Sequence, residues 1–100
     1  MAPDHRKVLT VITEAALERE LVKEIERLGA HGYTVADVRG KGGRGTRNAG
    51  WDWSADIRIE IVCTEETAHA IADTLKERYY ANYAMILFIG DVEVLRPEKF

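Results

Sequence analysis

The chain has 100 residues, of which 46% are hydrophobic, and its 14 basic and 17 acidic residues give a formal net charge of -3. This length predicts one domain over residues 1–100, and the acidic balance argues against nucleic acid as a partner. The single cysteine, Cys63, excludes an internal disulfide and fits a reducing cytoplasm. The three histidines are too scattered in the sequence for a metal site. No apolar run approaches the roughly 20 residues that span a membrane. We therefore expect a cytoplasmic protein without a metal.

The first half of the chain predicts strand, helix and strand in that order. Residues 7–13 are rich in β-branched side chains and predict a first strand, and Thr13 can cap the helix that follows. One apolar helical stripe then recurs at four, four and three residues, formed by Leu17, Leu21, Ile25 and Leu28. Gly29 or Gly32 ends this helix, and residues 33–39 predict a second strand.

The second half repeats this order. Residues 56–63 alternate between polar and apolar side chains, which predicts a half-buried strand. Thr64 and two glutamates open a second helix, whose apolar stripe is Ala68, Ile71, Ala72, Leu75 and Tyr79. A last strand covers residues 83–89, extends past Gly90 and ends by Pro97. The order predicts an α+β, ferredoxin-like β-α-β-β-α-β sandwich, with two helices on one face of an antiparallel sheet.

The last strand has an unusual pattern, because residues 84–89 are apolar at every position. A strand that is apolar on both sides needs cover on both faces, and the two helices can cover only one. Either the strand is more apolar than its surroundings require, or its second face is buried against a copy of the same chain. We predict the second case, a homo-oligomer.

The stretch from Arg39 to Gly50 carries five of the eight glycines, four cations and no acid. Glycine N–H groups can form a concave anion site, and arginine adds forked donors that fit phosphate. We expect this loop, about residues 40–55, to close on an anion such as the phosphates of a nucleotide; the alternative is a solvated loop between two strands. Trp51 and Trp53, further along, either meet a protein target or another subunit, or fold back on the sheet.

Four segments in the same order resemble the PII signal-transduction superfamily: Gly32-Tyr33-Thr34-Val35, Val38-Arg39-Gly40-Lys41-Gly42, residues 57–62 and residues 88–92. The loop is closest to PII-like proteins tied to inorganic carbon, namely those paired with bicarbonate transporters and those encoded with carboxysomes. The resemblance implies a regulatory homotrimer, not an enzyme, with nucleotide sites between subunits and a flexible T-loop that signals to a target. The implied ligands are ADP and AMP, with a cyclic nucleotide and bicarbonate as further candidates. The implied target is a bicarbonate transporter or a carboxysome-related protein, so that any membrane contact is peripheral.

The resemblance also implies which residues form the site. The base and ribose side is held by Gly32, Tyr33 and Thr34. The phosphates meet the loop root, formed by Gly40, Lys41 and Gly42, and one arginine, either Arg44 or Arg47. The last strand lines the base pocket with Phe88, Ile89 and Gly90. Arg96, near the carboxyl end, reaches the nucleotide of the neighbouring subunit.

One departure from the family pattern bears on the ligand. Residues 78–85 stand where standard PII proteins have a Thr-Gly-x-x-Gly-Asp-Gly-Lys phosphate cradle, and they contain neither glycine nor lysine. The resemblance therefore implies AMP, ADP or a cyclic nucleotide rather than ATP. An RNA-binding module is the alternative, because it shares the order of elements and could stack bases on Trp51 and Trp53, but residues 57–61 lack its aromatic motif. No nucleophile lies beside a base, so no enzyme is predicted.

Overall fold

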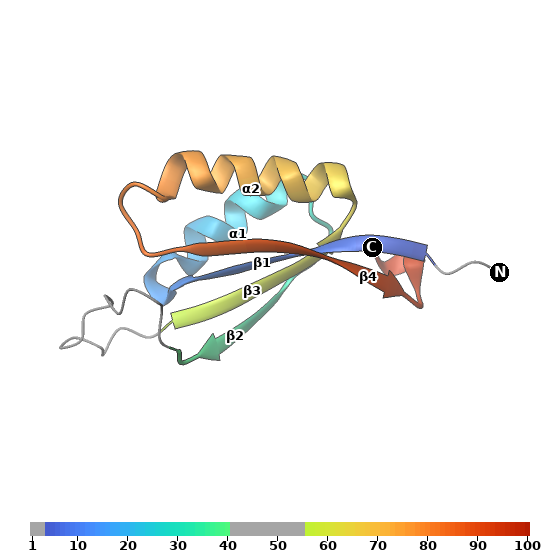
Figure 1. The fold of residues 1–100 in the computed structure, drawn as a ribbon, viewed down its shortest axis with the longest axis horizontal. Coiled ribbons are helices and arrows are strands. Elements are labelled where there is room, and N and C mark those ends of the chain that lie inside the picture. The colour runs from blue at the N-terminus through green and yellow to red at the C-terminus, as the bar shows by residue number, and fades with distance from the viewer. Residues whose placement is uncertain (1–3, 41–55) are drawn as a thin grey trace.

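The computed structural model describes residues 4–40 and 56–100. Its strands form one antiparallel sheet in the order β2-β3-β1-β4, and its two helices lie together on one face of that sheet (Figure 1). The elements are β1 (Asp4–Glu14), η1 (Ala15–Leu17), α1 (Glu18–Arg27), β2 (Thr34–Val38), β3 (Asp56–Cys63), α2 (Glu65–Tyr79), β4 (Ile86–Val94) and η3 (Pro97–Lys99). This confirms the ferredoxin-like α+β prediction. Neither helix of the described residues is long and apolar enough to cross a membrane.

Both helices bury the apolar stripes that the sequence predicts. In α1 and the turn before it, Leu17, Leu21 and Ile25 are at most 4% exposed, and the whole predicted stripe of α2 is buried. The Thr64 hydroxyl accepts a hydrogen bond from the Thr67 N–H at 3.2 Å, which caps α2. Gly29 has a φ of +107°, and this conformation ends the first helix where the sequence predicts.

The prediction that Thr13 caps the first helix is wrong. β1 continues through Thr13 to Glu14, because Glu14 still pairs with Asp56 of β3. Thr13 is fully buried in this strand, and its hydroxyl donates a hydrogen bond to the Ala84 carbonyl oxygen at 2.9 Å. The chain then turns through η1 into α1, which begins without a side-chain cap. Long-range strand pairing overrides the local capping signal.

The last strand begins three residues later than predicted. Both the Asn82 and Tyr83 N–H groups bond to the Tyr79 carbonyl oxygen, so residues 80–83 form a turn after α2 rather than a strand. From Ile86 onward β4 pairs continuously with β1 and passes Gly90 without a break.

The two faces of the sheet differ in burial. The helix face is the core, formed from the strands by Leu9, Val11, Ile57, Ile59 and Ile61, each at most 1% exposed. On the other face Ile86 and Phe88 are 51% and 54% exposed, and neither α1 nor α2 covers them (Figure 1). We call this side, with Val8, Thr10, Ile12, Ile86 and Phe88, the uncovered face. Its exposed apolar side chains are what the non-alternating last strand predicts.

The two helices are tied together by a polar cluster. The Glu24 carboxylate accepts hydrogen bonds from Arg27 at 2.7 Å and 3.1 Å and from Arg78 at 2.9 Å. The hydrogen bond from Arg27 is the main reason why the pKa of Glu24 falls to about 2. The Tyr79 hydroxyl donates to Glu20 at 2.7 Å, and burial followed by this hydrogen bond raises the pKa of Tyr79 to about 12.

Candidate functional site

A single cross-strand row on the uncovered face joins the two edges of the sheet. Thr34 of β2 pairs with Glu60 of β3, Glu60 pairs with Thr10 of β1, and Thr10 pairs with Phe88 of β4. Neighbouring strands lie about 4.8 Å apart, so Thr34 and Phe88 are separated by about 14 Å along this row. These two residues of the predicted nucleotide site therefore lie at opposite edges of the sheet of one chain.

The residues predicted for the base and ribose side lie at the beginning of β2. Gly32 and Tyr33 are exposed and directly precede the strand, and Thr34 is its first residue. Because side chains alternate along a strand, Thr34 faces the uncovered side and Tyr33 the helix side. Gly32 has no other heavy atom within 4 Å of the position that a Cβ would take, so the space beside it is open.

The residues predicted on β4 do not all face the same way. Phe88 points out of the uncovered face, and Gly90 lies opposite Val8 of β1. The Ile89 side chain packs against the core, so only its backbone is available to a ligand on the uncovered face. Arg96 lies beyond β4, exposed, with its Nε 3.6 Å from Glu98 Oε2.

The phosphate side of the predicted site is only partly within the described residues. Gly40 is exposed just after β2, and apart from its chain neighbours no described residue has a heavy atom within 4 Å of its Cβ position. Lys41, Gly42, Arg44, Arg47, Trp51 and Trp53 lie outside the described residues. The flanking strands do place the root of the loop, because Val38, Asp56 and Glu14 form one row at the end of the sheet.

The connection between α2 and β4 offers no obvious cradle for phosphates. It follows the C-terminus of a helix, where the backbone dipole favours cations rather than anions. The Asn82 and Tyr83 N–H groups are already bonded to the Tyr79 carbonyl oxygen, and the Ala84 carbonyl oxygen accepts from Thr13. Neither of these two N–H groups is therefore free to bind an anion.

Glu60 is a hydrogen-bond acceptor in this row that was not predicted from the sequence. Its side chain is 44% exposed beside Thr34, with Oε2 3.6 Å from Arg58 Nε. A carboxylate there can accept hydrogen bonds from an amine or a hydroxyl of a bound molecule. The alternation of residues 56–63 already places Glu60 away from the core, but only the strand register puts it next to Thr34. No group of acids, histidines or cysteines in the described residues could hold a metal.

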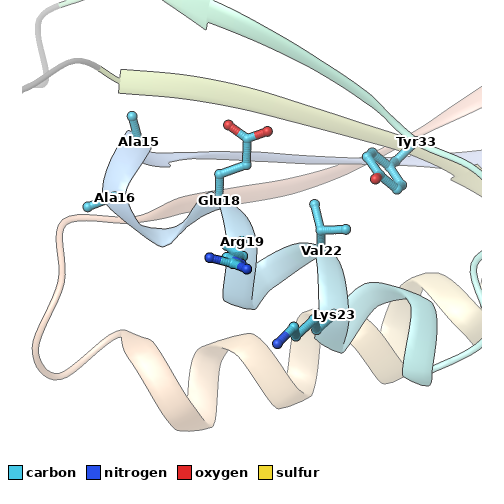
Figure 2. Close-up of a pocket in the computed structure, with 7 residues that line it drawn as sticks. All are labelled: Ala15, Ala16, Glu18, Arg19, Val22, Lys23 and Tyr33. Carbon is cyan, nitrogen blue, oxygen red and sulfur yellow. The ribbon is translucent and has the colours of Figure 1, made fainter.

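A separate pocket lies on the helix side of β2, between this strand and the beginning of α1 (Figure 2). It encloses about 500 Å³ and is lined by Ala15, Ala16, Glu18, Arg19, Val22, Lys23 and Tyr33. Tyr33 is the one predicted site residue in this lining. Thr34 and Phe88 face the opposite side of the sheet, so the pocket shares only Tyr33 with the candidate nucleotide site.

Comparison with known proteins decides the family. The family model described as nitrogen regulatory protein P-II matches residues 6–99. The chain belongs to the P-II family. Among solved structures, this P-II protein is similar to a PII-like protein from Thermus thermophilus, with 42% identity over 100% of this chain and 99% of the other and a TM-score of 0.83. The family prediction is confirmed, and P-II proteins are regulatory proteins.

Two structures of CPII, a PII-like protein from Thiomonas intermedia, carry ligands. One, bound to ADP, AMP and acetate, has 25% identity, covers 100% of this chain and 98% of its own, and has a TM-score of 0.83. The other, bound to ADP and bicarbonate, has 26% identity, covers 99% and 97%, and also has a TM-score of 0.83. Adenine nucleotides and bicarbonate are thus ligands of a similar P-II protein.

Proposed function

We propose that this P-II protein is a homotrimer that senses adenine nucleotides, ADP or AMP, in clefts between its chains. The observation that carries the proposal is the row from Thr34 to Phe88. One chain holds these residues about 14 Å apart along the same sheet, so a molecule that contacts both side chains closely needs two chains. The exposed Ile86 and Phe88 on the same face supply apolar surface for such an association.

The chemistry of the row fits a nucleotide base and ribose. The flat adenine ring can pack on Phe88, since aromatic rings stack in offset arrangements. The Thr34 hydroxyl and the Glu60 carboxylate offer hydrogen-bond partners next to each other on β2 and β3. Gly90 has no side chain to keep a ring away from the backbone of β4.

The phosphates would meet the root of the 40–55 loop. No described residue beyond its chain neighbours crowds Gly40 there, and Lys41, Arg44 and Arg47 follow it in the sequence. Since no phosphate cradle is evident between α2 and β4, one or two phosphates fit the proposal better than three. When the site is empty, repulsion among these cations opposes a single fixed conformation of the loop. A bound anion would favour one loop conformation, because it offsets this repulsion, and would so change the surface that the loop presents to a target.

We extend the proposal to inorganic carbon. Bicarbonate is a planar anion that backbone N–H groups and a guanidinium can hold as they hold a carboxylate. The CPII structure with ADP and bicarbonate supports a second anion beside the nucleotide. The proposed target is a bicarbonate transporter or a carboxysome-related protein, reached in the cytoplasm, and the proposed role involves no catalysis.

Isothermal titration calorimetry tests the proposal with ADP, AMP, cyclic AMP and ATP, each with and without bicarbonate. We expect micromolar binding of ADP or AMP, weaker binding of ATP, and weaker ADP binding in Arg47→Ala. Lys76→Ala, which removes the same charge from the exposed side of α2, is the matched control and should bind ADP as the unmodified protein does. No heat with any adenine nucleotide would overturn the proposed function.

A further inference from the structure

The pocket between α1 and β2 is an open groove in the single chain (Figure 2). It exists because β2 is an edge strand, while the buried stripe of α1 packs into the core. Glu18 and Val22 point from α1 toward the strands, and the Tyr33 ring lies beyond Val22. Tyr33 is 40% exposed, so an aromatic ring and an aliphatic side chain remain accessible in the groove.

The rim of this groove is basic. Arg19 and Lys23 are exposed one helical turn apart, and neither extends toward the strands as Glu18 and Val22 do (Figure 2). Neither forms an ion pair with any residue in 4–40 or 56–100, whereas Arg27 and Arg78 both contact Glu24.

Arg19 is unfavourable for the helix itself. It lies in the first turn of α1, where the dipole disfavours positive charge. It is also four residues from Lys23, a spacing at which like charges destabilise a helix, whereas Lys23 lies three residues from both Glu20 and Glu26, a spacing that favours opposite charges. Residues that break a local rule without a compensating contact often serve a binding site.

We propose that this groove docks an extended acidic segment of a partner protein. An apolar side chain of the segment would pack on Val22 and Tyr33, and its carboxylates would pair with Arg19 and Lys23. Glu18 inside the groove sets a constraint, because an acid placed over it would be repelled. The segment therefore carries its acids over the rim and an apolar residue over the floor.

The groove is connected to the proposed nucleotide site through β2, and this connection rests on the proposed function. Tyr33 and Thr34 are consecutive residues that face opposite sides of the sheet. A partner held at Tyr33 and a nucleotide held at Thr34 would thus restrain the same edge strand. If each favours the same strand position, each strengthens the other's binding by the same factor.

Fluorescence anisotropy tests the docking with a fluorescein-labelled heptapeptide of alternating glutamate and leucine, and a lysine–leucine heptapeptide as the probe of opposite charge. The full-length protein should bind the glutamate peptide only. The double variant Arg19→Glu, Lys23→Glu should weaken this binding about tenfold or more, which corresponds to about 1.4 kcal/mol. The milder pair Arg19→Gln, Lys23→Gln should weaken it less. The control pair Lys76→Glu, Lys99→Glu makes the same change in net charge on exposed residues outside the groove and should leave it within about twofold.

The outcomes separate the two proposals. An absent anisotropy change, or an equal loss in the groove pair and the control pair, overturns the docking surface. ADP titrations on the same preparations report the nucleotide site independently. Peptide binding without ADP binding supports the groove and overturns the coupling through β2, whereas ADP binding without peptide binding overturns the groove alone. Tighter peptide binding in the presence of ADP supports the coupling.

Discussion

Replacing Phe88 by alanine should weaken the proposed association of the chains into a trimer. Phe88 is 54% exposed in a single chain. For a side chain of about 200 Å² this leaves about 110 Å² to be covered by a neighbouring chain, worth about 2.7 kcal/mol at about 25 cal/mol per Å². Alanine keeps its Cβ, so the loss is about 2 kcal/mol per chain and about 6 kcal/mol for a trimer.

This loss converts into a measurable shift in concentration. About 6 kcal/mol lowers the trimer association constant about 10⁴-fold. Because the midpoint concentration of a monomer–trimer equilibrium follows the inverse square root of that constant, it should rise about 100-fold. Sedimentation over a range of chain concentrations measures the midpoint. A rise of this order in the midpoint concentration is the expected result.

Tyr80→Ala is the matched control for this experiment. Tyr80 is an aromatic residue of similar exposure, 45%, but it follows α2 rather than lying on the uncovered face. Its truncation should leave the midpoint unchanged. Equal shifts in the two variants, or no shift in Phe88→Ala, would refute the reasoning that the uncovered face is the contact surface.

Three further predictions concern the fold. Gly29→Ala places a side chain at a φ of +107° and should cost about 1–2 kcal/mol of stability, lowering the melting temperature at fixed chain concentration; an unchanged value would contradict the helix end described here. Thr64→Ala removes the cap of α2 and should cost about 1 kcal/mol in urea unfolding, whereas Thr64→Ser should cost little. The pKa of Glu24 is lowered from 4.5 to about 2, chiefly by Arg27, so its contribution to stability is present above pH 4.5 and is lost as the pH falls toward 2. The melting temperature should therefore fall more steeply over this range in the unmodified protein than in Glu24→Gln, and parallel curves would argue against the cluster.

Periodicity predicted the buried residues well, because burial on one side of an element leaves a local trace. The alternation at Ile57, Ile59 and Ile61 gave the bounds of β3, and the stripe through Leu21 and Ile25 gave the buried side of α1. The unbroken apolar run of residues 84–89 also predicted that β4 carries apolar side chains on the face that the helices do not cover, where Ile86 and Phe88 are exposed.

Capping could not be predicted from local signals alone. Thr13 and Thr64 both precede a glutamate and an apolar helical stripe, yet only Thr64 is a cap. The difference is that Glu14 pairs with Asp56, far along the chain, and that the Ala84 carbonyl oxygen is available to the buried Thr13 hydroxyl. Long-range pairing of this kind has no local signature.

The candidate site, too, could be predicted only in part from the sequence. The motifs around Thr34 and Phe88 named the right family, but the motifs alone did not show that both residues lie in one row at opposite edges of the sheet. The register also adds Glu60 to that row and turns the Ile89 side chain toward the core. Site residues on a sheet thus require the register as well as the motif.

Native mass spectrometry of the unmodified protein with ADP counts chains and nucleotides in one particle. We expect three chains that carry up to three ADP molecules, and no ADP on the single chains seen at high dilution. A single chain that binds ADP by itself, or a trimer that binds none, would contradict a nucleotide site built between identical chains.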